Sequence, residues 1–258
     1  MCETHDSRPP IEPRPSGIAS SGDIRLNGSD GNRPRAYFAR AAAPRGIGVI
    51  VIPARLGLLP FYEQLTDRLA EAGIDAIALD LYGRTADDDL RDDGFDFEAH
   101  YRAVTAVEAR PEVDSDVKAA IDFLESDAGG AVDVVFTLGF CFGGSVSWWQ
   151  SAVEPRLSGS IGLYGAPKYV ADLVPDMEAP LLMLVAGADT FVSEGEMRDF
   201  QVALAQSGVP FEVKTYPGAP HSFFDRRYRE HSDAARDAWD QILRFISRHS
   251  SDRAPVSE

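Results

Sequence analysis

Three side chains that lie far apart in the sequence have the types needed for nucleophilic catalysis. Cys141 lies in "TLGFCFGGSVSWW", as a Gly-x-Cys-x-Gly pattern between a β-branched apolar run and a helix-like run. Asp189 follows the apolar run "LLMLVAGAD", and His221 lies in the loop-like stretch "YPGAPHSFF". A thiol can attack an acyl carbon, an imidazole can move its proton, and a carboxylate can orient the imidazole. The three residue types therefore predict acyl transfer.

The glycines on either side of Cys141 indicate a turn too sharp for ordinary side chains. A strand–Gly-x-nucleophile-x-Gly–helix turn is the nucleophile elbow of α/β-hydrolases, whose catalytic residues follow the chain order nucleophile, acid, base. The positive end of the following helix favours a thiolate. We expect backbone amides of Phe142 and of the loop near Arg55 to hold the oxyanion that forms on attack.

Each of these residues also has a purely structural interpretation. Cys141 fits a buried, inert cysteine in a glycine-rich turn, because free cysteine is among the most buried residue types. Asp189 fits a turn or helix cap, and His221 fits a surface loop. Three matches at three expected strand ends favour the catalytic interpretation.

The elements that must position these residues alternate between strands and helices. Weak alternation over 22–28 and 35–42 is typical of edge strands or a hairpin, whereas the continuous apolar run 45–54 is typical of a strand buried on both faces. Further strands are expected over 74–83, 131–140, 157–165, 179–189 and 210–218. Helical spacing is expected over 58–73, 111–130, 143–153, 193–208 and 232–249. This order predicts an α/β-hydrolase fold with a mostly parallel central sheet and helices on both faces. Right-handed crossovers bring the carboxyl ends of parallel strands to one edge, where the residues after each strand are Arg55, Asp80 to Arg84, Cys141, Tyr164, Asp189 and His221.

The length and local composition of the chain indicate one domain with loose ends. The 258 residues suit a single α/β domain, which we expect to span 18–249. Residues 1–17 are polar and rich in Pro and Arg and are predicted to form a disordered leader, and 250–258 a loose tail. The acidic stretch 84–101 shows no periodicity and is predicted as a surface excursion. Whether its part 87–96 acts as a lid is left open.

The charge of the chain argues against two classes of partner. The net charge of −16, from 25 basic and 41 acidic residues, repels nucleic acid and anionic membranes. No apolar run approaches the ~18 residues of a membrane helix, and the first residues lack a signal-peptide core, so we expect a cytoplasmic protein. Two cysteines and five scattered histidines offer no zinc-site spacing, and no metal is expected. A monomer and a homodimer both remain open.

Four stretches carry a resemblance to a known family. "GFCFGG", "AGADTFV", "PGAPHSFF" and "LDLYGR", within residues 45–245, resemble the dienelactone hydrolase family, which a cysteine elbow distinguishes from serine-based relatives. The resemblance implies an α/β-hydrolase fold and no cofactor. It also implies hydrolysis of a small lactone or ester that carries a carboxylate, by a Cys-His-Asp triad through an acyl-enzyme.

The resemblance also implies residues that bind substrate. Arg84, in "DLYGR", matches an arginine that faces the substrate carboxylate in this family. A second such arginine follows the histidine, and here Asp225 stands at the expected offset with Arg226 beside it. The family's glutamate near the resting thiol is absent from the loop "PARLGLLP", where Arg55 stands near its place and the first carboxylate is Glu63.

Arginine in place of that glutamate leaves alternative functions open. A cation near the sulfur favours a standing thiolate or a different anionic substrate. A thioesterase or general carboxylesterase is a close alternative. A ligand-binding or redox-sensing protein on a hydrolase scaffold is a more distant one, in which Cys141 would be oxidised reversibly instead of acylated.

Overall fold

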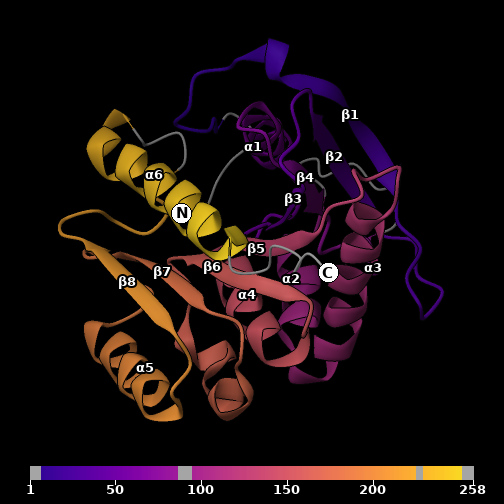
Figure 1. Ribbon diagram of the computed structural model, residues 1–258. Helices are drawn as coiled ribbons and strands as arrows, with labels where there is room; N and C mark the ends of the chain where they lie inside the picture. Colours follow the sequence, from indigo (N-terminus) through magenta and orange to yellow (C-terminus); the bar gives the residue numbers. More distant parts are fainter. Residues whose placement is uncertain (1–6, 87–94, 225–228, 252–258) are drawn as a thin grey trace, which may run out of the picture.

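The computed structural model describes residues 7–86, 95–224 and 229–251. Within them, eight strands form one sheet in the order β1-β2-β4-β3-β5-β6-β7-β8 (Figure 1). The strands from β4 to β8 run parallel to one another, whereas β2 is antiparallel to β1 and β4. The prediction of a mostly parallel sheet is therefore confirmed. The strands are β1 (Ile18–Arg25), β2 (Arg35–Ala41), β3 (Ile47–Ile52), β4 (Asp75–Leu79), β5 (Val134–Phe140), β6 (Leu157–Leu163), β7 (Leu181–Ala186) and β8 (Phe211–Tyr216).

Helices cover both faces of this sheet, as Figure 1 shows. On one face α1 (Pro60–Glu71) and α6 (Ser232–Ser250) share an apolar core with the strands. On the other face the core is shared with α3 (Arg110–Glu125), α4 (Phe142–Val153) and α5 (Glu194–Ser207). Every residue of β3, β4, β5 and β6 is buried, which explains why these strands are mostly apolar and β3 entirely so. Among the helices of the described residues, none is long and apolar enough to cross a membrane.

The register of the parallel strands places the predicted site residues at one edge of the sheet. The strand ends lie within two residues of one another: Ile52 pairs with Gly139, Phe140 with Leu163, Leu163 with Leu184, and Ala186 with Tyr216. The residues that follow β3, β5, β6, β7 and β8 consequently emerge side by side. This edge is where ligands bind in open parallel sheets.

The amino-terminal segment is packed where the structure describes it. Ile11 contacts the core between α1 and α6, and the carbonyl of Gly17 accepts a hydrogen bond from the amide of Ala42 at 2.8 Å. A short 3₁₀ helix, η1 (Pro15–Gly17), leads into β1. The prediction of a disordered leader therefore does not describe residues 7–17. Residues 1–6 lie outside the described residues, as do 252–258 of the predicted tail.

A helix, α2 (Phe97–Thr105), forms within the stretch predicted to be a surface excursion. Asp96 caps it, its side chain accepting a hydrogen bond from the amide of Ala99 at 3.0 Å. The apolar residues Phe97, Tyr101 and Val104 recur at helical spacing, and Val104 is buried. The capping residue and the helical periodicity together could have predicted this helix, but the acidic residues around them favoured a loop. Of the segment considered as a lid, residues 87–94 lie outside the described residues.

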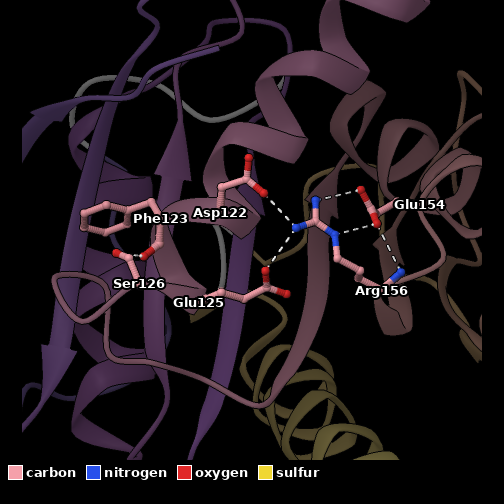
Figure 2. Close-up of polar contacts among 6 residues, drawn as sticks. All are labelled: Asp122, Phe123, Glu125, Ser126, Glu154 and Arg156. Atoms are coloured by element: carbon pink, nitrogen blue, oxygen red, sulfur yellow. Dashed lines mark hydrogen bonds and ion pairs between the residues drawn. The ribbon is translucent and has the colours of Figure 1, made fainter. Parts of the chain in front are cut away.

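An ion-pair cluster secures α4 at the sheet edge opposite the site (Figure 2). Arg156, just before β6, contacts Asp122 at 2.7 Å and Glu125 at 3.0 Å on α3, and Glu154 at the end of α4 at 2.9 Å. The hydrogen bond that Arg156 donates to Glu154, together with the other two carboxylates, raises the pKa of Arg156, although partial burial opposes this. The cluster joins α3, α4 and β6, so the helix that follows Cys141 is held at its far end. Three short 3₁₀ helices complete the described elements: η2 (Val107–Ala109), η3 (Pro167–Tyr169) and η4 (Ala171–Asp176).

Candidate active site

Cys141 lies at the tip of the tight turn between β5 and α4. Its backbone has φ 53° and ψ −118°, a conformation that L-residues avoid and that costs about 1–3 kcal/mol. The turn is possible because the neighbouring glycines let backbones touch. A Cβ on Gly139 would lie 1.8 Å from the carbonyl oxygen of Gly143, and a Cβ on Gly143 would lie 2.2 Å from that of Ile52. The amide of Cys141 donates to the carbonyl of Leu163 at 3.0 Å, which fixes the elbow against β6.

His221 and Asp189 form a buried hydrogen-bonded pair. The distance from Nδ1 of His221 to Oδ2 of Asp189 is 2.7 Å, and the two side chains are 5% and 6% exposed. Burial acts to raise the pKa of Asp189, but hydrogen bonds and charge from His221 and the amides of Phe191 and Val192 outweigh it and lower the pKa. Because an ionised carboxylate only accepts hydrogen bonds, Nδ1 must carry the proton, and the lone pair of the neutral imidazole lies on Nε2.

Two aromatic rings hold the imidazole from its sides. The ring centres of Tyr164 and Phe191 each lie 4.9 Å from that of His221. Tyr164 follows β6 directly and has φ 40°, so it belongs to the same sheet edge as the elbow. Sequence reasoning marked Tyr164 as a strand-end residue but gave it no role, and it missed Phe191 altogether.

One cavity brings most of these residues together. It measures about 540 Å³ and its lining is mainly apolar and aromatic. The residues around it are Arg55, Leu56, Tyr101, Cys141, Phe142, Tyr164, Ala166, Lys168, Tyr169, Phe191, Val192 and His221. Asp189 lines a neighbouring cavity of about 360 Å³ and reaches the first one through His221. A thiol, an imidazole and the carboxylate that is hydrogen-bonded to this imidazole thus lie at one end of the sheet.

The loop after β3 is held in place by two tyrosine hydroxyl groups. The amide of Ala54 donates to the hydroxyl of Tyr62 at 2.8 Å, and the hydroxyl of Tyr82 donates to the carbonyl of Arg55. The guanidinium of Arg55 points toward α2, where it pairs with Glu98 at 2.9 Å and lies 5.7 Å from the ring centre of Tyr101. A carboxylate therefore borders this loop after all, contributed by α2 and not by the loop itself.

Arg84 is engaged elsewhere, which corrects the prediction that it faces the substrate. It donates to both carboxylate oxygens of Asp116 at 2.9 and 2.7 Å and pairs with Asp30 at 2.6 Å. It does not line the cavity around Cys141, and its side chain is 15% exposed. The arginine joins α3 to the loop between β1 and β2 and is satisfied there. Arg226, the other predicted arginine, lies outside the described residues.

Sequence reasoning missed a cation at the rim of the cavity. Lys168 lies in η3, just beyond Tyr164, and its Nζ is 4.9 Å from the ring centre of Tyr169. In the sequence, Lys168 was indicated only by its place in "YGAPKY", a stretch that follows an expected strand end. Among the described residues, no group of three or more His, Cys, Asp or Glu side chains is arranged to hold a metal ion.

Comparison with known proteins agrees with this architecture. The model of the dienelactone hydrolase family matches residues 35–250. The chain belongs to the dienelactone hydrolase family. A relative from Salmonella typhi named "Putative carboxymethylenebutenolidase" is 30% identical over 250 residues, covering 91% of this chain and 90% of its own. "Protein usf" of Aquifex pyrophilus is 30% identical over 234 residues, covering 85% of this dienelactone hydrolase family member and 95% of its own length.

Solved structures show the same fold. The crystal structure titled "Putative Dienelactone Hydrolase" from Klebsiella pneumoniae is 26% identical with a TM-score of 0.77, covering 88% of this chain and 98% of that one. A dienelactone hydrolase-like promiscuous phosphotriesterase from metagenomic libraries is 22% identical with a TM-score of 0.74, covering 89% and 99%. At that identity the second likeness concerns the fold alone. This dienelactone hydrolase family member is therefore an α/β-hydrolase along most of its length.

Proposed function

We propose that this protein hydrolyses a small carboxylic ester or lactone through an acyl-enzyme on Cys141. The observation that carries the proposal is the buried pair of His221 and Asp189, whose imidazole borders the cavity that contains the strained elbow of Cys141. The names of the relatives support the same reaction class, since the Salmonella typhi protein is named "Putative carboxymethylenebutenolidase" and a Bradyrhizobium relative "Probable 2-oxo-3-(5-oxofuran-2-ylidene)propanoate lactonase". The apolar and aromatic lining suits a small substrate with a flat apolar part.

In the proposed acylation, the sulfur of Cys141 attacks the carbonyl carbon of the substrate. The C–S bond forms as the carbonyl π electrons move to oxygen, and His221 accepts the thiol proton at Nε2. Phe142 is the first residue of α4, so its amide has no acceptor within the helix and suits the oxyanion. The second donor in this proposal is the backbone amide of Arg55, in the loop held by Tyr62 and Tyr82.

In the second half of the reaction the tetrahedral adduct collapses and the C–O bond breaks. The leaving alkoxide takes the proton from Nε2 of His221, and a lactone opens to a hydroxyacyl thioester at this point. Water then attacks the thioester while His221 accepts a water proton, and the C–S bond breaks to return the thiol and the carboxylic acid. Asp189 stays ionised throughout and stabilises the imidazolium, consistent with its lowered pKa.

The test is a pair of single substitutions assayed with an activated aryl ester and small lactones. We expect Cys141→Ala and His221→Ala each to lower kcat/KM at least about 10³-fold while the protein stays folded. Mass spectrometry of wild type mixed with a slow ester should show an acyl adduct on Cys141. Substantial residual activity in either variant would contradict the proposal. A peroxide-dependent sulfenic acid in the absence of any acyl adduct would favour the redox-sensing alternative.

A further inference from the structure

Two cations border the cavity around Cys141 in the described part of the chain, and they differ in their partners. Arg55 pairs with Glu98, so part of its charge is already balanced. Lys168 is exposed and its ammonium lies over the ring of Tyr169, itself part of the cavity wall. Among the described residues no carboxylate lies within ion-pair distance of Lys168. Its charge is therefore available to a ligand in the cavity.

The backbone of Lys168 is fixed relative to the nucleophile. The hydroxyl of Ser145, on the first turn of α4, accepts from the amide of Ala166 at 2.8 Å and lies 3.0 Å from its carbonyl oxygen. Arg110 donates to the carbonyl of Tyr169 at 2.7 Å. Both neighbours of the Pro167–Lys168 segment are thus held, one of them by the helix that follows Cys141. The backbone from which the Lys168 side chain extends is therefore anchored to the helix that begins next to Cys141.

The acidic character of the chain makes a single cation beside the cavity important for binding an anion. The chain carries a net charge of −16, and only three of its 25 basic residues are lysines, namely Lys118, Lys168 and Lys214. A strongly acidic surface repels anionic ligands, so an anion enters the cavity only where a nearby cation offsets that field. Glu196 accepts hydrogen bonds from the amide and hydroxyl of Ser193, which lower its pKa, and the charge of Lys168 helps to lower it, but Glu196 and Lys168 are not within ion-pair distance. Glu196 therefore does not form an ion pair with the ammonium of Lys168.

From the place of Lys168 at the rim of the aromatic cavity that contains Cys141, we infer that its ammonium binds a carboxylate of the substrate, remote from the scissile carbonyl. This inference rests on the proposed function. It gives Lys168 the specificity role predicted from sequence for Arg84, which two aspartates hold away from the cavity. The ammonium lies 4.9 Å from the ring centre of Tyr169, which also lines the cavity, and this cation–π contact favours a position beside the cavity wall.

A pair of matched esters tests the inference. The mono-4-nitrophenyl ester of adipic acid carries a free carboxylate, and its methyl ester is the neutral counterpart. We expect Lys168→Met to lower the ratio of kcat/KM for the acid to that for the neutral ester about tenfold, as loss of a charge-assisted contact predicts. Lys168→Arg should retain most of the ratio. Lys118→Met, an exposed lysine on α3 outside the cavity, should leave both rates as in wild type.

Each outcome has a distinct meaning. A fall in the ratio through KM of the acid alone, rescued by arginine, supports the inference. An unchanged ratio in Lys168→Met, or an equal fall for both esters, overturns it while the hydrolysis of the neutral ester by wild type leaves the proposed function intact. If wild type hydrolyses neither ester and forms no adduct on Cys141, the proposed function fails, and the role of Lys168 in that reaction fails with it.

Discussion

Replacing Arg84 with methionine tests whether this arginine stabilises the fold or binds the substrate. The side chain makes two hydrogen bonds to Asp116, which is only 6% exposed, and one ion pair to Asp30, which is 36% exposed. The contact with Asp30 contributes little, because exposed pairs stabilise by less than about 1 kcal/mol. Removing the partner of a buried carboxylate costs about 3–5 kcal/mol. The amide of Asn32, 3.2 Å from Asp116, remains and offsets part of that loss.

We therefore expect Arg84→Met to lower the free energy of unfolding by about 3 kcal/mol at neutral pH. For a domain of this size the loss corresponds to a fall in Tm of about 8 °C. Burial raises the pKa of Asp116 although Arg84 opposes it, and without Arg84 the pKa rises further. Since a raised carboxylate pKa destabilises the fold only while the group is ionised, the deficit should shrink as pH falls through that pKa.

Urea unfolding across a pH series measures this deficit, with Arg244→Met as a control. Arg244 is 57% exposed on α6 and pairs loosely with Asp237 at 3.8 Å, so its loss should change stability by less than about 0.5 kcal/mol. In Arg84→Met, the ratio of kcat/KM for the acidic adipate ester to that for the neutral one should equal the wild-type ratio. A variant that keeps wild-type stability but loses the preference for the acid would refute this reasoning and restore Arg84 to the substrate.

Two further substitutions test the elbow and the pair behind it. Gly143→Ala places a Cβ 2.2 Å from the carbonyl oxygen of Ile52. We therefore expect a severe loss of acylation rate, measured by stopped flow, and of thermal stability. A near-normal acylation rate would show that the turn tolerates a side chain. Asp189→Asn should lower kcat/KM about 10³-fold, because the amide no longer fixes the proton on Nδ1 of His221. The lowered pKa of Asp189 contributes stability above its ordinary value of 3.8, and this is lost as pH falls through the lowered pKa. Urea titrations of wild type and Asp189→Asn should therefore converge in acid, and a gap that widens there would contradict the assignment.

The sequence by itself determined the features that depend on short stretches of chain. Alternation of apolar runs with helical periodicity specified the parallel sheet, because a strand buried on both faces has a nearly continuous apolar sequence. The Gly-x-Cys-x-Gly stretch specified the turn, since only glycine permits the contacts made by Gly139 and Gly143. Chain order at strand ends brought Asp189 and His221 to one edge, where they are in contact.

Only the tertiary structure decided which polar side chains find partners. Arg84 turns to Asp116, 32 residues away, and Arg55 to Glu98, 43 residues away, and no local pattern encodes such pairings. Lys168 became a candidate only when its ammonium proved to border the cavity without a carboxylate partner among the described residues. The physical reason is range: backbone conformation and burial follow from neighbours in sequence, whereas the free energy of a charge depends on whatever the fold places within a few ångströms of it.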